Sequence, residues 1–185
     1  MVELSSLRDN ETGHHMQRVG LYANLMAREL GMPETYCKDL EIFAPMHDIG
    51  KVGIPDAILL APRKLTPEEF TILKNHTILG HTILSRSPEL EMAGLICRHH
   101  HERYDGSGYP DGLSGRAIPL AARLTSLADV YDALRSRRPY KGPWSHEDTI
   151  EEMVKGRGTQ FDPELLDLFL DLENNIQEIF SLLPD

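Results

Sequence analysis

Apolar side chains recur at helical spacing along most of this chain. Between residues 15 and 30, an apolar or histidine side chain returns every three or four positions, and Gly31 follows as a helix C-cap. No segment alternates strictly between apolar and polar residues, as a half-buried strand would. The pattern therefore predicts an all-α fold, a single compact bundle of about seven helices. These lie within residues 15–30, 33–47, 66–76, 87–101, 120–134, 145–153 and 163–172.

Helix-start and helix-stop signals support these limits. Residues 66–69 (TPEE) form a capping box with proline at the first helical position. Ser145 is expected to cap the helix that follows it, and the pair Asp162-Pro163 is expected to start the final helix. Pro45 should bend or end the second helix just before His47, because proline cannot donate the helical hydrogen bond. Residues 102–119 contain four glycines and two prolines, which predicts a long ordered loop of the kind that usually serves function.

Composition limits the class of protein. A chain of 185 residues with a net charge of −10 fits one domain and argues against a general nucleic-acid or membrane-surface binder. Cys37 and Cys97 are too few for a disulfide framework and indicate reduced, packed thiols. No apolar run approaches the roughly 18 residues of a membrane span, and the first residues lack signal-peptide character. We expect a cytoplasmic protein.

Several histidines and carboxylates stand where metal ligands would be useful. His47 and Asp48 form an adjacent pair with Lys51 three residues further on, and histidines occupy positions 99 to 101. Asp129 interrupts an apolar helix face, where an unpaired carboxylate would cost several kcal/mol. Each residue alone is more simply explained as an exposed charge or a hydrogen-bonded core residue. Together they favour a metal site, which also draws on Glu11, His15 and His76.

This set of ligands has a definite chemistry. Imidazole and carboxylate without thiolate suit Fe, Mn, Zn and similar cations. Two such ions about 3.5 to 4 Å apart stabilise both the attacking and the leaving oxygen of a phosphodiester. Asp48 is the natural bridge between them, and Lys51, Arg138 and Lys141 would stabilise charge on the phosphate.

The arrangement resembles the HD-GYP branch of the HD phosphohydrolase superfamily. The resemblance runs from about residue 7 to 170, and such domains commonly follow a regulatory module, so the domain spanning 1–185 can be part of a longer protein. The matching segments are residues 11–15 (ETGHH), 47–51 (HDIGK), 100–110 (HHERYDGSGYP), 128–134 (ADVYDAL), 138–141 (RPYK) and 158–163 (GTQFDP).

The resemblance implies hydrolysis of cyclic di-GMP to pGpG or GMP with two or three divalent ions, Fe or Mn. Asp48 and Lys51 would act in catalysis, whereas His14 and His99 fall outside the ligand pattern. Substrate would be held by Lys51, Tyr109, Arg138 and Lys141. By position, the metal ligands would be Glu11, His15, His47, Asp48, His76, His100, His101 and Asp129.

Two other functions stay open at this stage. One is an HD-type phosphohydrolase that acts on another nucleotide, although the glycine-rich loop speaks against it. The other is a non-catalytic receptor, or a module that binds diguanylate cyclase (GGDEF) domains through that loop. The oligomeric state, a homodimer included, cannot be read from the sequence.

Overall fold

The computed structural model describes residues 13–136 and 142–184, and this part of the chain is helical without a strand. Four short 3-10 helices join the α-helices: η1 (Ala44–Met46), η2 (Ile49–Gly53), η3 (Pro88–Leu90) and η4 (Gly115–Ala117). The α-helices are α2 (Gly13–Glu29), α3 (Glu34–Phe43), α4 (Asp56–Leu59), α5 (Pro67–Leu84), α6 (Glu91–His99), α7 (Leu120–Arg135), α8 (His146–Lys155), α9 (Pro163–Asp171) and α10 (Glu173–Leu182).

The predicted all-α class is confirmed, and each of the seven expected helices is present. Two described helices were not predicted. The helix α4 is a single turn and too short to show periodicity, and α10 lies beyond Leu172, where the predicted final helix ended. The Thr66–Glu69 capping box forms, and α3 ends at Phe43, two residues before Pro45. Among the described residues, no helix has both the length and the apolar character needed to cross a membrane.

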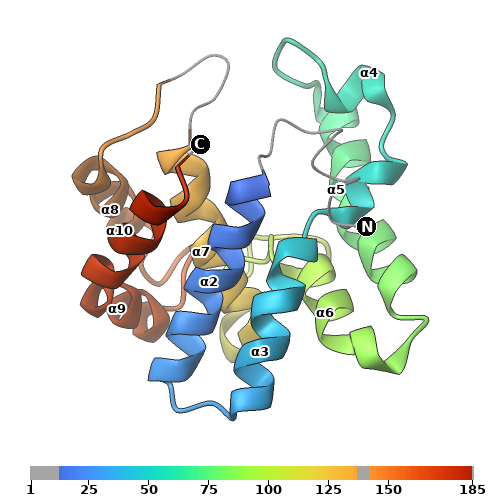
Figure 1. Cartoon of the computed structure of the whole chain (residues 1–185). Coiled ribbons are helices and arrows are strands. Elements are labelled where there is room, and N and C mark those ends of the chain that lie inside the picture. Colours follow the sequence, from blue (N-terminus) through green and yellow to red (C-terminus); the bar gives the residue numbers. More distant parts are fainter. Residues whose placement is uncertain (1–12, 137–141, 185) are drawn as a thin grey trace.

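The main core forms around α2 and α7. Figure 1 shows α2 running across the middle of the molecule, with α3 on one side and α7 behind it. Tyr22 of α2 meets Tyr131 of α7 edge to face, and Tyr131 meets Phe169 of α9 in the same way. All three rings are fully buried. Aromatic pairs in this geometry add about 0.5 to 1.5 kcal/mol beyond the burial of their area.

A second packing region brings η2 onto α5 and α6. Gly50 of η2 lies so close to α5 that a Cβ atom there would stand 1.9 Å from the carbonyl oxygen of His76. One helical turn further along α5, a Cβ atom on Gly80 would lie 3.0 Å from the Cβ of Cys97 in α6 and 3.3 Å from the backbone nitrogen of Gly50. Small residues at these points let three backbones approach closely, which fixes the His47–Lys51 segment against the helix that carries His76.

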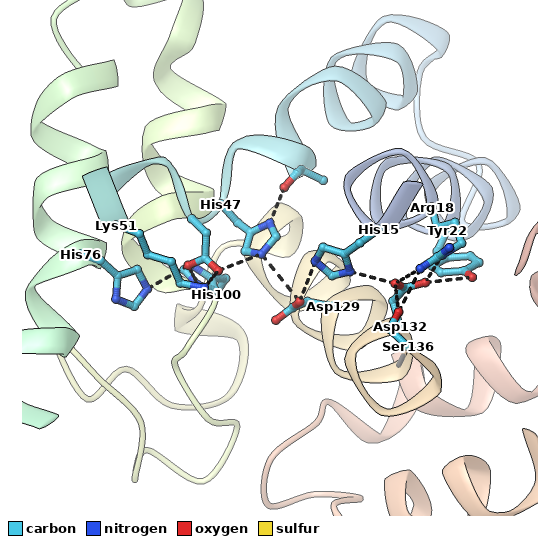
Figure 2. A network of polar contacts seen from close by, with 12 residues as sticks. His15, Arg18, Tyr22, His47, Lys51, His76, His100, Asp129, Asp132 and Ser136 are labelled. Carbon is cyan, nitrogen blue, oxygen red and sulfur yellow. Dashed lines mark hydrogen bonds and ion pairs between the residues drawn. The ribbon is translucent and has the colours of Figure 1, made fainter. Parts of the chain in front are cut away.

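A buried ionic cluster ties α2 to the end of α7. Asp132 has no exposed surface and accepts hydrogen bonds from Arg18 Nε at 2.6 Å, Arg18 Nη2 at 2.8 Å and His15 Nδ1 at 2.8 Å. Tyr22 and Ser136 donate weaker ones at 3.3 and 3.1 Å (Figure 2). Burial alone would raise the pKa of the Asp132 carboxyl, but the contacts with His15 and Arg18 outweigh it and lower this pKa.

Replacing Asp132 should therefore destabilise the fold strongly. Asp132→Ala leaves the fully buried Arg18 guanidinium without its carboxylate, and removing one partner of such a pair costs roughly 3 to 5 kcal/mol. Urea unfolding of chelator-treated protein measures this loss without a contribution from metal. The exposed pair Arg116–Glu164 provides the control, since Arg116→Ala should leave the free energy of unfolding near the wild-type value. A free energy for Asp132→Ala within 1 kcal/mol of wild type, a margin well below that estimate, would contradict this account.

Candidate metal centre

Seven of the eight predicted metal ligands lie in two adjoining groups. In each group the candidate ligand atoms are within 4.8 Å of one another. We name them by their carboxylates. The Asp48 group comprises Asp48, His76, His100 and His101, and the Asp129 group comprises His15, His47 and Asp129.

Asp48 connects the two groups, because its carboxylate oxygens face in different directions. Its Oδ1 lies 3.1 Å from His76 Nε2 and 3.6 Å from His100 Nε2. Its Oδ2 lies 3.4 Å from His47 Nε2 in the other group. His47 Nε2 in turn lies 3.6 Å from Asp129 Oδ1. A carboxylate placed in this way can serve two cations at once.

Five segments supply these side chains. His15 comes from α2, His76 from α5 and Asp129 from α7, while His100 and His101 follow the last residue of α6. His47 and Asp48 occupy the two positions between η1 and η2. Pro45 within η1 helps to end the helical path, so that this adjacent pair turns inward between the helices. Figure 2 shows His47 between His76 and His100 on one side and His15 and Asp129 on the other.

The inner ring nitrogens of four histidines are already engaged. Nδ1 of His47, His76 and His100 each faces the carbonyl oxygen three residues earlier, of Ala44 at 2.9 Å, Leu73 at 2.7 Å and Cys97 at 3.0 Å. His15 Nδ1 faces Asp132. A carbonyl or carboxylate oxygen can only accept, so each Nδ1 carries the proton and each Nε2 keeps its lone pair. This second layer of contacts is typical of metal-binding histidines.

The charge state of the site suits a divalent cation. Burial would raise the pKa of Asp48, but Lys51 and His47 hold this pKa well below its usual range, so the group is a carboxylate. Burial lowers the pKa of His100 and, further, that of His101, so both rings are neutral. Nε2 of His76 and of His100 is buried and makes no hydrogen bond within the described residues. Buried lone pairs beside a carboxylate are the donor set of a metal site.

Lys51 lies at the edge of this centre. Its Nζ is 2.6 Å from Asp48 Oδ2, and the side chain is 15% exposed, so the ammonium reaches both the carboxylate and the surroundings. Tyr109 lies beside the Asp48 group, where its ring stacks on that of His101 with the centroids 4.8 Å apart. The predicted loop thus brings Tyr109 next to the candidate ligands.

The glycine-rich loop is fixed by Glu102, which the sequence analysis did not single out. This carboxylate is buried and accepts hydrogen bonds from the backbone N–H groups of Asp111 at 2.7 Å and Leu113 at 3.0 Å. Asp105 N–H also donates to the carbonyl of Thr159. A carboxylate directly after the histidine run, within a loop rich in glycine, was the available signal for this anchoring role.

His99 and His14 lie away from the two groups. The His99 ring faces Glu102 and Asp111, which form a third group of candidate ligands. There Glu102 already binds backbone N–H groups, and Asp111 pairs with Arg98 at 2.7 Å, so the group serves to anchor the loop. His14 is exposed and contacts the carbonyl of Pro184.

Three predicted site residues, Glu11, Arg138 and Lys141, lie outside the described residues. Asp132 is a second functional residue that the sequence analysis missed. It stands in the same helix as Asp129, and a carboxylate buried at either position needs a partner.

Known proteins with similar sequences are cyclic-dinucleotide phosphodiesterases by name. The chain is 48% identical over 179 residues to a cyclic di-GMP phosphodiesterase of Thermotoga maritima, covering 96% of this chain and 49% of that protein. It is 42% identical to a 3′3′-cGAMP-specific phosphodiesterase of Vibrio cholerae, covering 96% of this chain and 34% of that protein. The chain thus spans about half the length, or less, of these relatives.

Solved structures share the fold. The HD domain of the phosphodiesterase PgpH from L. monocytogenes, solved with cyclic di-AMP, aligns with a TM-score of 0.67 at 20% identity, covering 100% of this chain and 97% of that one. An HDG"Y"P protein from Bdellovibrio bacteriovorus aligns with a TM-score of 0.66 at 20% identity, covering 86% of this chain and 51% of that one.

The sequence also matches a protein-family model, that of the HD domain. Its sequence model matches residues 1–165, which include the His47–Asp48 pair and every candidate ligand. The Gly108-Tyr109-Pro110 segment follows the His100–His101 pair after six residues. The chain therefore belongs to the HD domain family.

Proposed function

We propose that this domain is a metal-dependent phosphodiesterase that hydrolyses cyclic di-GMP to pGpG or GMP. One observation supports this most strongly: Asp48 turns one carboxylate oxygen toward each of two histidine groups. That arrangement suits two cations that share a ligand, which is a recurrent solution for phosphodiester hydrolysis. The similarity to cyclic di-GMP phosphodiesterases provides the substrate class.

In this proposal the chain's own residues hold and orient the reacting groups. The metal ligands are His15, His47, Asp48, His76, His100, His101 and Asp129, with Glu11 as a further one beyond the described residues. Divalent ions held there would supply Lewis-acid stabilisation of the charged oxygens.

Lys51 places an ammonium beside Asp48 and would hold negative charge that develops on the phosphate. Tyr109 forms a wall of the site next to His101 and would face the substrate. Arg138 and Lys141 are proposed to bind the dinucleotide from outside the described residues.

The finer assignments are part of the same proposal. The cations would be Fe or Mn, because an imidazole and carboxylate set without thiolate suits these metals. Their number, two or three, depends on whether Glu11 contributes. A cytoplasmic location, association with GGDEF domains and a homodimer remain predictions.

A closely related substrate is the main alternative. The 42% identity to a 3′3′-cGAMP-specific phosphodiesterase is little below the 48% identity to the cyclic di-GMP phosphodiesterase. The metal centre would act in the same way on either substrate, since both are cyclic dinucleotides.

A purely binding role is the other alternative. The double variant with His47→Ala and Asp48→Ala distinguishes binding from catalysis, because a cellular effect that survives this change is exerted by contact.

Activity on cyclic di-GMP tests the proposal directly. Protein purified without oxygen and loaded with Fe²⁺ or Mn²⁺ should convert cyclic di-GMP to pGpG or GMP, with chromatography separating the products. A parallel assay with 3′3′-cGAMP ranks the two substrates by kcat/KM. The absence of product from cyclic di-GMP with both metals would refute the proposed activity, and a higher kcat/KM on 3′3′-cGAMP would favour the alternative.

Lys51 offers a sharper test of the mechanism. Lys51→Ala removes charge stabilisation and should lower kcat about 100-fold or more, as loss of one such group does elsewhere. Metal content per chain should stay near the wild-type value, because Lys51 is not a ligand. Lys38→Ala is the control, since Lys38 is exposed and lies away from the metal centre, where it pairs with Glu34. Equal losses of metal and of kcat would show that Lys51 supports the centre and does not act on the phosphate.

A further inference from the structure

Lys74 lies between two aromatic rings at the border of the metal centre. Its Nζ is 4.9 Å from the ring centroid of Phe70 and 5.1 Å from that of Tyr109. Phe70 and Lys74 are one helical turn apart on α5, whereas Tyr109 comes from the glycine-rich loop. The two rings meet edge to face with their centroids 6.2 Å apart. Cation–π attraction to both rings therefore holds the ammonium in one place.

This ammonium has no acidic partner within the part of the chain that the structure describes. Lys51 pairs with Asp48, Lys38 with Glu34 and Lys155 with Glu152, but no carboxylate lies within ion-pair distance of Lys74. An aromatic ring attracts a cation without cancelling its charge. Lys74 therefore keeps a full positive charge that an anion can use, in a chain whose net charge is −10.

The position of Lys74 relates it to the substrate. The ring of Tyr109 contacts the ammonium of Lys74 and also stacks on the ring of His101 in the Asp48 group. His76, two residues after Lys74 on α5, belongs to the same group. Phe70 is 43% exposed, so this corner opens to the surroundings. A molecule bound at the Asp48 group and extending past Tyr109 reaches Lys74 next.

We propose that Lys74 binds the second phosphate of a cyclic dinucleotide while the first is cleaved at the metal centre. The inference rests on the proposed function, since it needs a substrate with two phosphodiesters. Only one of them is hydrolysed in a given step, and the other remains an anion that an acidic protein must neutralise. Lys74, held in advance by Phe70 and Tyr109, provides that charge at little cost in side-chain order.

Kinetics on two substrates test this role. Lys74→Met keeps an unbranched side chain against the rings but removes the charge. It should raise KM for cyclic di-GMP about tenfold, as expected for one lost hydrogen bond to a charged group, with little change in kcat. With bis(4-nitrophenyl) phosphate, which has a single phosphodiester, both parameters should stay at wild-type values. Lys74→Arg should recover most of the affinity for cyclic di-GMP.

Lys64→Met is the matched control, because Lys64 is exposed just before α5 and makes no ion pair among the described residues. It should leave both substrates unaffected. An unchanged KM of Lys74→Met for cyclic di-GMP would overturn the inference. A fall in kcat on both substrates would also overturn it, because Lys74 would then act by positioning Tyr109 and His101. A wild-type enzyme that cleaves bis(4-nitrophenyl) phosphate but not cyclic di-GMP would refute the proposed function itself.

Discussion

The carboxylate of Asp48 is the contact on which the site depends. It lies between two groups of candidate ligands, and each of its oxygens faces one of them. A buried carboxylate is costly unless it is paired. Here Lys51 and His47 keep it ionised in spite of burial. The close approach of Gly50 to α5 fixes where this carboxylate lies, so the geometry of the site depends on how these two backbone segments pack.

Around this contact the fold provides a layer that orients the ligands. Three histidines direct Nδ1 to carbonyls in their own segments, and a fourth directs it to Asp132. Asp132 also neutralises the buried Arg18, so the same carboxylate joins α2 to α7 and sets the protonation of His15. Glu102 fixes the glycine-rich loop in a similar way, because it accepts hydrogen bonds from two backbone N–H groups of that loop. The helical frame and the candidate centre thus share their polar contacts.

Local patterns allowed much of this to be predicted. The helix limits follow from apolar periodicity and capping residues, and the Thr66–Glu69 box forms as its sequence indicates. The clustering of His47, Asp48 and Asp129 follows from chemistry, because such residues need partners. What the sequence could not provide was long-range pairing. Asp132 meets Arg18 across 114 positions, and Lys74 meets Tyr109 through a loop whose course depends on Glu102. The single-turn α4 was missed because one turn shows no periodicity.

The central claim is that Asp48 joins two cation sites, and anomalous diffraction tests it most directly. Crystals of Mn²⁺-loaded protein should show two anomalous peaks about 3.5 to 4 Å apart, on either side of the Asp48 carboxylate. One peak should lie against His76, His100 and His101, and the other against His15, His47 and Asp129. A single peak, or two peaks of which only one contacts Asp48, would contradict the account.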